Sequence, residues 1–117
     1  MTEFKPLVTY DVFTKLDLRV ATVIAAEPHP NADRLLKLEI DLGSEKRQIC
    51  AGVKQYYAAQ DLVGKQVVVV SNLEPRMIRG ELSNGMLLAA SVQDGDALGD
   101  IVLVEPSKQV PEGSAVS

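Results

Sequence analysis

Residues 35–43 read LLKLEIDLG and, after a short Gly-Ser turn, residues 46–52 read KRQICAG. Apolar and charged side chains alternate along the first segment, which is the period-2 pattern of a strand with one buried face. Because so few residues separate the two segments, we expect them to pair as an antiparallel hairpin. The predicted inward positions are Leu36, Leu38, Ile40 and Leu42.

Further strands are predicted on both sides of this hairpin. DLRVATVIAAE at 17–27 predicts a long strand before it, and KQVVVVSN at 65–72 predicts a buried strand after it. Two later apolar segments, GMLLAASV at 85–92 and IVLVEP at 101–106, predict the last strands. The tail that follows, SKQVPEGSAVS, is expected to be extended.

Two short helices are predicted between and before the strands. VTYDVFTKLD at 8–17 has apolar residues at helical spacing, and Thr9 is a suitable N-cap. KQYYAAQDLVG at 54–64 contains helix formers followed by Gly64 as a stop. Turn residues dominate three loops, at 28–34, 72–84 and 93–100, and the second could hold a short strand around 77–79.

This order of elements predicts an all-β fold, an OB-fold, in which five strands form a Greek-key barrel. Other β-barrels with one helix remain possible. The chain is expected to be a single domain over residues 1–117, with its core at about 10–105. OB-folds bind ligands with the loop between their first two strands and the loop between their last two. These loops are PHPNADR at 28–34 and NLEPRMIRGELSN at 72–84.

Composition restricts the possible functions. The chain has 117 residues, 46% of them hydrophobic, and Cys50 is its one cysteine, so it has no internal disulfide. The N-terminal residues lack the apolar stretch of a signal peptide, and no segment has the length of a membrane span. We therefore expect a soluble, cytoplasmic protein.

The net charge of −4 argues against a general nucleic-acid binder. The charge is uneven, because residues 1–79 carry 11 basic and 10 acidic side chains while residues 80–117 carry one and six. An acidic molecule can therefore still present a basic face. In the predicted barrel Arg34, Arg76 and Arg79 all lie on the ligand-binding loops, where guanidinium groups can contact phosphates in bidentate fashion. The alternative is that these are solvated charges, with Arg76 and Arg79 paired to Glu74 and Glu81.

The chain resembles the tRNA-binding domain family from about residue 10 to residue 116. The resemblance depends on several segments in order, above all HPNADRL at 29–35 and NLEPRMIRGELSNGM at 72–86. Departures from the family pattern include Ala21 and Ala51, and the Arg76-Met77-Ile78-Arg79 sequence where a lysine-rich one is usual. Such domains occur at the C-terminus of many methionyl-tRNA synthetases and as free-standing proteins, and the starting Met and the length suggest a free-standing chain.

The resemblance implies a non-catalytic homodimer that binds tRNA by its folded shape and needs no cofactor. Terminal segments, here 1–16 and 106–117, would form much of the dimer interface, and an aminoacyl-tRNA synthetase is a possible partner. A neighbouring branch, the CsaA-like chaperones, is associated with protein export and binds peptides. Its loop lacks the SNGM form found here at 83–86, so this sequence favours the tRNA-binding branch. A docking module for a synthetase is a further alternative.

Candidate RNA-binding residues follow from the loops and from the resemblance. Asn31 could instead shape its loop, Ser83 could be a turn residue and Met86 a core residue. Tyr10 and Phe13 are expected either in the core or at the dimer interface, and Val110 at that interface. The full RNA-binding set is Asn31, Arg34, Lys54, Arg76, Arg79, Ser83 and Met86.

We find no catalytic constellation and no metal site in the sequence. His29, the one histidine, lies between two prolines and is expected to be an ordinary loop residue, because metal and acid-base sites need partners. Cys50 is expected to be a small core residue. The few aromatic residues lie mostly on predicted helices, which disfavours a general single-strand binder that stacks bases.

Overall fold

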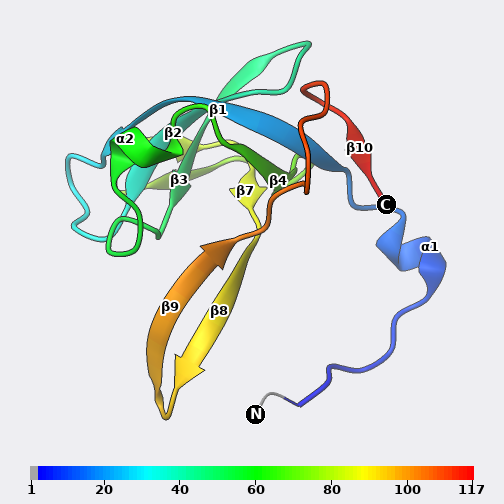
Figure 1. Cartoon of the computed structure of the whole chain (residues 1–117). Coiled ribbons are helices and arrows are strands. Elements are labelled where there is room, and N and C mark those ends of the chain that lie inside the picture. The colour runs from blue at the N-terminus through cyan, green and yellow to red at the C-terminus, as the bar shows by residue number, and fades with distance from the viewer. Residues whose placement is uncertain (1–2) are drawn as a thin grey trace.

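The computed structural model describes residues 3–117, which form a nearly closed, barrel-shaped sheet with two short helices (Figure 1). The helices are α1 (Tyr10–Phe13) and α2 (Ala59–Leu62). The strands are β1 (Leu18–Pro28), β2 (Leu36–Asp41), β3 (Lys46–Ala51), β4 (Gln66–Val70), β5 (Arg76–Ile78), β6 (Glu81–Ser83), β7 (Met86–Leu87), β8 (Ala89–Asp94), β9 (Ala97–Leu103) and β10 (Ala115–Val116).

The long strand β1 is the centre of the sheet, whose order is β3-β2-β1-β4-β7 with β10 also paired to β1. All these pairings are antiparallel. The first half of β1 pairs with β4 and its second half with β2, and the register shifts between Val23 and Ala25. Such a bulge bends a strand, and β1 curves visibly along the barrel (Figure 1).

The predicted hairpin at 35–52 is confirmed as β2 and β3, which pair from Leu36↔Ala51 to Asp41↔Lys46. All four predicted inward residues are buried, and all five residues of β4 are buried as well. Leucine, isoleucine and valine side chains of β1 to β4 therefore fill the interior. The core cluster comprises Ala21, Val23, Leu36, Leu38, Ile40, Leu42, Ile49, Ala51, Val53, Leu62, Val67, Val69 and Leu103.

A second hairpin, β5–β6, closes the barrel over β3. The Cys50 N–H donates to Ser83 Oγ at 3.0 Å, and the Asn84 N–H donates to the Gln48 carbonyl at 2.9 Å. Strand β5 was anticipated around 77–79, whereas β6 was not. Cys50 lies half-buried beneath this hairpin and outside the core cluster, so its prediction as a core residue was wrong.

Helix α1 and the β8–β9 hairpin both project away from the barrel (Figure 1). Thr9 caps α1 as predicted, since its side chain accepts a hydrogen bond from the Val12 N–H, but the helix is only four residues long and buries none of them. Tyr10 is 76% exposed and Phe13 39% exposed, which removes the alternative that they lie in the core. Strand β8 is exposed along its whole length.

Three element predictions needed correction. The expected helix at 54–64 is reduced to α2, because residues 54–57 form a turn and a bend instead. The single strand expected at 85–92 is divided into β7 and β8, which belong to different sheets. Residues 93–100, expected as a loop, mostly extend β8 and β9 around a turn at Gly95.

The C-terminal segment crosses back over the sheet. Its backbone at Val110 exchanges two hydrogen bonds with the side chain of Gln66, at 2.7 and 3.0 Å. Gly113, at φ +85°, passes so close to the residue after β2 that a Cβ would overlap the Leu42 carbonyl oxygen. The tail predicted to be extended therefore ends as β10 against β1.

Candidate nucleic-acid interface

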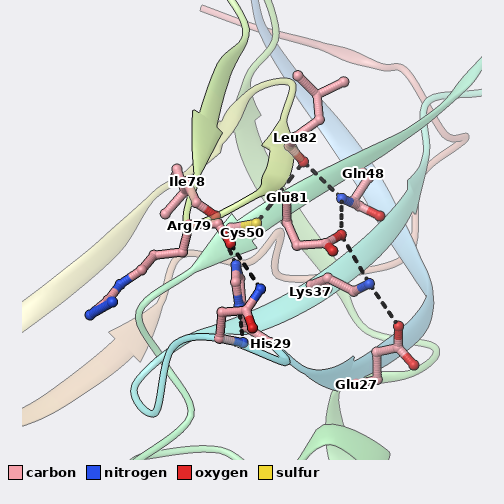
Figure 2. Close-up of polar contacts among 10 residues, drawn as sticks. Glu27, His29, Lys37, Gln48, Cys50, Ile78, Arg79, Glu81 and Leu82 are labelled. Carbon is pink, nitrogen blue, oxygen red and sulfur yellow. Dashed lines mark hydrogen bonds and ion pairs between the residues drawn. The ribbon is translucent and has the colours of Figure 1, made fainter.

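The structure joins the two predicted ligand-binding loops. The Asn31 side-chain amide donates to the Arg79 carbonyl at 3.1 Å, and His29 Nε2 lies 2.8 Å from the Ile78 carbonyl oxygen (Figure 2). Both contacts connect the loop after β1 to the tip of the β5–β6 hairpin. The two segments, almost fifty residues apart in the sequence, therefore form one continuous edge of the barrel.

Arg79 occupies the hairpin turn in an unusual backbone conformation. Its φ is +53° and that of Gly80 is +89°, so both central residues of this two-residue turn are left-handed. Hairpin turns of this kind normally carry Asn-Gly or Asp-Gly, because most side chains are strained at positive φ. The conformation directs the Arg79 guanidinium away from the barrel toward solvent (Figure 2).

Ion pairing divides the basic residues into two groups. Four of them, Arg19, Lys37, Arg47 and Lys65, lie within 4 Å of a carboxylate. By contrast, the four predicted RNA-binding cations are exposed, and none has an ion-pair partner among residues 3–117. They are Arg34, Lys54, Arg76 and Arg79. The predicted pairing of Arg76 and Arg79 with Glu74 and Glu81 is therefore wrong in this structure, whereas the exposure of both arginines is also what solvated surface charges show.

Glu81 is instead bound to Lys37. The Lys37 Nζ lies 3.1 Å from carboxylate oxygens of both Glu81 and Glu27, and the Gln48 amide donates to Glu81 at 3.3 Å (Figure 2). The hydrogen bond from Lys37 holds the pKa of Glu81 below its usual value, and the same bond raises the pKa of Lys37. Lys37 therefore engages both carboxylates, and neither Glu27 nor Glu81 pairs with an arginine of the loops.

A small cavity of about 150 Å³ opens beside Arg76. Leu73, Ile78 and Met86 provide apolar walls, and Glu74 and Arg76 lie among its lining residues. Met86 is 48% exposed, so the alternative that it is a core residue is wrong. Burial raises the pKa of the Cys50 thiol, which also lines this cavity.

Ser83 has a different position from the other candidates. Its side chain is buried, its oxygen accepts from the Cys50 N–H, and its hydroxyl donates to the Gly85 carbonyl at 3.2 Å. A hydroxyl engaged in this way holds β6 against β3. Ser83 therefore stabilises the β5–β6 hairpin, in which it lies directly opposite Arg76.

The remaining candidates fall into neighbouring groups. The Lys54 N–H donates to the Arg34 carbonyl at 3.4 Å, which places the backbones of these two residues next to each other. Asn31 lies against Arg79, and Arg76 and Met86 share the cavity. Sequence reasoning missed His29, which is only 4% exposed. The one signal was its position inside the HPNADRL motif, since its partner Ile78 is distant in sequence.

Residues 3–117 contain no group of three or more His, Cys, Asp or Glu side chains that could hold a metal ion. Within the same residues, no helix has the length and apolar character needed to cross a membrane. The nearly closed, barrel-shaped sheet with two short helices is that of an OB-like barrel.

Comparison with known proteins gives the family. The profile of the family described as "Putative tRNA binding domain" matches residues 18–115, and the chain therefore belongs to the tRNA-binding domain family. The methionine–tRNA ligase of Chlorobium chlorochromatii is 50% identical over 114 residues, and that of Clostridium tetani is 49% identical over 112. These alignments cover 97% and 96% of this chain but only 16% and 17% of the ligases, so the chain spans about one-sixth of their length.

Solved structures agree with this assignment. A MetRS related protein from Pyrococcus horikoshii superposes with a TM-score of 0.87 at 33% identity, with 97% of this chain and all of that chain covered. The chaperone CsaA from Bacillus anthracis superposes with a TM-score of 0.83 at 33% identity, covering 96% and 100%. The predicted resemblance and the barrel-shaped fold are both confirmed.

Proposed function

We propose that the protein binds folded tRNA without catalysing a reaction, through the loop after β1 and the β5–β6 hairpin. The observation that carries this proposal is the set of exposed basic side chains without ion-pair partners among residues 3–117, three of them on these two joined loops and Lys54 in the segment after β3 that contacts the first loop. Arg76, Arg79, Arg34 and Lys54 would contact phosphates, which provide most of the affinity for nucleic acids. Met86 would contact a base or ribose beside Arg76.

The arrangement suits a folded RNA better than an unstructured one. The aromatic side chains of the chain do not line the cavity beside Arg76, so successive bases have no stacking platform there. Hydrogen bonds fix the two loops relative to one another. Their basic side chains can therefore contact phosphates that lie at a fixed spacing, as they do in a folded RNA. Recognition would depend on the shape of the RNA backbone, as is common for folded RNA.

A homodimer is part of the proposal. Phe4, Leu7, Val8 and Tyr10 are highly exposed around α1, and the projecting β8–β9 hairpin exposes Val92, Leu98 and Val102. Apolar residues gathered on projecting segments mark interaction surfaces. The proposed interface comprises Tyr10, Phe13 and Val110 together with the terminal segments 1–16 and 106–117.

We also propose that residues 1–117 act as a single domain and that the protein is cytoplasmic.

The test is a titration of labelled mixed tRNA and of an unstructured RNA of equal length, each at about 50 and about 200 mM salt. The proposal expects tighter binding of tRNA at low salt and a steep loss of affinity at high salt. Equal affinity for both RNAs would remove the claim of shape recognition. If neither RNA bound at low salt, the proposal would be wrong.

A second candidate is peptide binding of the kind that the name of the CsaA chaperone implies. The apolar cavity between Leu73, Ile78 and Met86 and the structural similarity to CsaA favour it. It predicts peptide binding that changes little with salt. A docking role on a synthetase would instead require the synthetase for RNA binding, and adding purified methionyl-tRNA synthetase to the titration tests this.

A further inference from the structure

One face of strand β5 and of the two residues before it lines the cavity beside Arg76. The lining residues Glu74, Arg76 and Ile78 occupy every second position, whereas Pro75 and Met77 do not line the cavity. Side chains two residues apart lie on the same face of an extended chain, about 7 Å from each other. A residue before proline is restricted to extended conformations, so the alternation continues back to Glu74. A carboxylate and a guanidinium therefore border one cavity from the same face of the chain.

Both charged groups are available to a ligand. Glu74 and Arg76 are exposed, and neither forms an ion pair within residues 3–117. Ser83 also lines the cavity, but its hydroxyl is already engaged within the fold. A ligand in the cavity would thus meet a carboxylate, which can only accept hydrogen bonds, and a guanidinium, which can only donate them.

The remaining lining is largely apolar and suits a flat group. Leu73 is 39% exposed and Met86 48% exposed, so both present apolar surface that a ligand can cover. Met86 is held beside the end of β4, because it pairs in register with Val70. Methionine is flexible, and its sulfur makes favourable contacts with aromatic rings. The volume of about 150 Å³ lies below the roughly 300 to 1,000 Å³ of pockets for drug-sized ligands, so the cavity suits one ring system and not a stack.

These groups match one RNA base better than the other three. Guanine has two adjacent donors, N1–H and N2–H, which can bond to the two oxygens of a carboxylate, and its O6 and N7 accept from an arginine. On the same edge, adenine and cytosine offer one donor group beside a ring acceptor, and uracil offers one donor between two acceptors. A carboxylate would face an acceptor in each of those bases. Guanine is therefore the base for which both charged groups find partners.

We propose that this cavity holds one unstacked guanine of the bound RNA, with Glu74 on its N1–H and N2–H and Arg76 on its O6 and N7. Leu73 and Met86 would cover the ring. The inference rests on the proposed tRNA-binding function and adds a base contact to the phosphate contacts of the loops. Phosphate contacts position a nucleic acid, whereas contacts to base edges distinguish one base from another. Folded RNA offers such edges on the unstacked bases of its loops and bulges.

The charge of Glu74 gives this inference a diagnostic sign. Glu74→Gln removes a negative charge beside the RNA, which by itself would strengthen binding to a polyanion. The inference expects the opposite result, because an amide offers one acceptor oxygen where guanine presents two donors.

Mononucleotides test the guanine site in the free protein. Isotope-labelled methionine methyl groups of the full chain would be followed by NMR while guanosine, inosine, adenosine, cytidine and uridine monophosphates are added in separate titrations. All five carry the same phosphate, so differences in affinity come from the base. Inosine is the matched probe, because it differs from guanosine only in lacking the exocyclic amino group. Met77 is the internal control, since it is 64% exposed but does not line the cavity.

We expect the Met86 methyl signal to shift with guanosine monophosphate, at an affinity about fivefold above that for inosine monophosphate, while the Met77 signal stays in place. Glu74→Gln should bind these two nucleotides equally. Glu39→Gln, which changes an exposed carboxylate outside the cavity, should retain the preference. Equal affinity of wild type for all five nucleotides, or a preference that survives in Glu74→Gln, would overturn the inference. A Met86 signal that responds to no nucleotide would also overturn it, and a response to an apolar peptide instead would favour peptide binding.

Titration of tRNA with the same three proteins separates this inference from the proposed function. Glu74→Gln should bind tRNA about fivefold more weakly than wild type, the factor that corresponds to one hydrogen bond, and Glu39→Gln controls for the change in charge. Equal or tighter binding by Glu74→Gln would overturn the inference and leave the phosphate contacts of the loops in place. A wild-type protein that binds no tRNA would contradict the proposed function, while the mononucleotide titrations would still judge the guanine site.

Discussion

The Nζ of Lys37 lies 3.1 Å from a carboxylate oxygen of Glu81, and this ion pair ties β2 to β6 across the face of the barrel. The Lys37 side chain is 17% exposed and that of Glu81 25%, so solvent screens the pair less than a surface pair. The contact has two consequences. It fixes the hairpin that carries Arg76 and Arg79. It also engages the Glu81 carboxylate, which therefore forms no ion pair with either arginine.

Glu81→Gln should lower the free energy of unfolding at neutral pH. The pKa of Glu81 is lowered in the folded protein, chiefly by Lys37, so its stabilising effect is present above the unfolded pKa, which is about 4.3 for glutamate. That effect is lost as the pH falls through the folded pKa. Urea unfolding of wild type and variant between about pH 7 and pH 3 should therefore show a difference that narrows on acidification.

Glu39→Gln is the matched control for this experiment. Glu39 lies on the same strand as Lys37 and is exposed, and it is in no ion pair within residues 3–117. We expect this variant to match wild type at each pH. Equal losses in the two variants, or a Glu81→Gln difference that does not change with pH, would contradict the role of the ion pair.

Arg79→Asn should separate folding from RNA binding. Asn tolerates the positive φ of this position better than Arg does, because its short polar side chain can bond locally. We expect the variant to be as stable as wild type, or more stable by up to about 1 kcal/mol, while it binds tRNA less tightly. Urea unfolding and tRNA titration of the same preparation measure both quantities.

Arg79→Lys retains the charge and the backbone strain, so it should keep wild-type stability and most of the affinity for tRNA. A destabilised Arg79→Asn protein would contradict the interpretation of the turn. Undiminished tRNA binding by Arg79→Asn would exclude Arg79 from the interface.

Met86→Ala should weaken tRNA binding about three- to tenfold, as expected for losing part of one apolar side-chain contact. Because Met86 carries no charge, the dependence of affinity on salt should stay that of wild type. Titrations at several salt concentrations test both statements. A changed salt slope would show that the substitution disturbs the neighbouring Arg76. Unchanged affinity would show that Met86 does not contact the tRNA and would leave the cavity available for another ligand.

Tyr10→Ser/Phe13→Ser should shift the protein from dimer to monomer. Both side chains are exposed on α1, where burial against a second chain would remove apolar surface from water. Sedimentation velocity over a range of concentrations measures the change. Val63→Ser, which removes an exposed apolar side chain near α2, should leave the association unchanged. A wild-type protein that stays monomeric at every concentration would refute the proposed homodimer.

Local patterns account for the parts of the fold that sequence analysis predicted. The alternation at 36–42 depends on one strand with one buried face, so a few residues were enough to predict it. The cap at Thr9 is equally local. The two loops proposed to bind the ligand followed from turn residues between strands, and the proposal that they bind it followed from the family motifs they carry.

Other features depend on contacts between distant segments. Strand β6 was missed because Arg-Gly does not signal a tight hairpin in the way that Asn-Gly does, although Arg79 takes the same backbone conformation. Strands β8 and β9 were partly read as a loop because β8 has no buried face to create a periodic pattern. The contact of His29 with Ile78 could not be predicted, because it forms only when the loop after β1 and the β5–β6 hairpin are brought together in the fold.

The most direct test of the account is the salt dependence of tRNA affinity for Arg76→Ala/Arg79→Ala, compared with wild type and Lys46→Ala. Lys46 is an exposed lysine at the far end of the β2–β3 hairpin, without an ion-pair partner in residues 3–117. We predict weaker binding by the double variant and a log–log salt slope shallower by about one for each arginine that contacts a phosphate. Lys46→Ala should retain the wild-type slope. A wild-type slope in the double variant, or equal losses in the double variant and Lys46→Ala, would contradict an RNA interface on these loops.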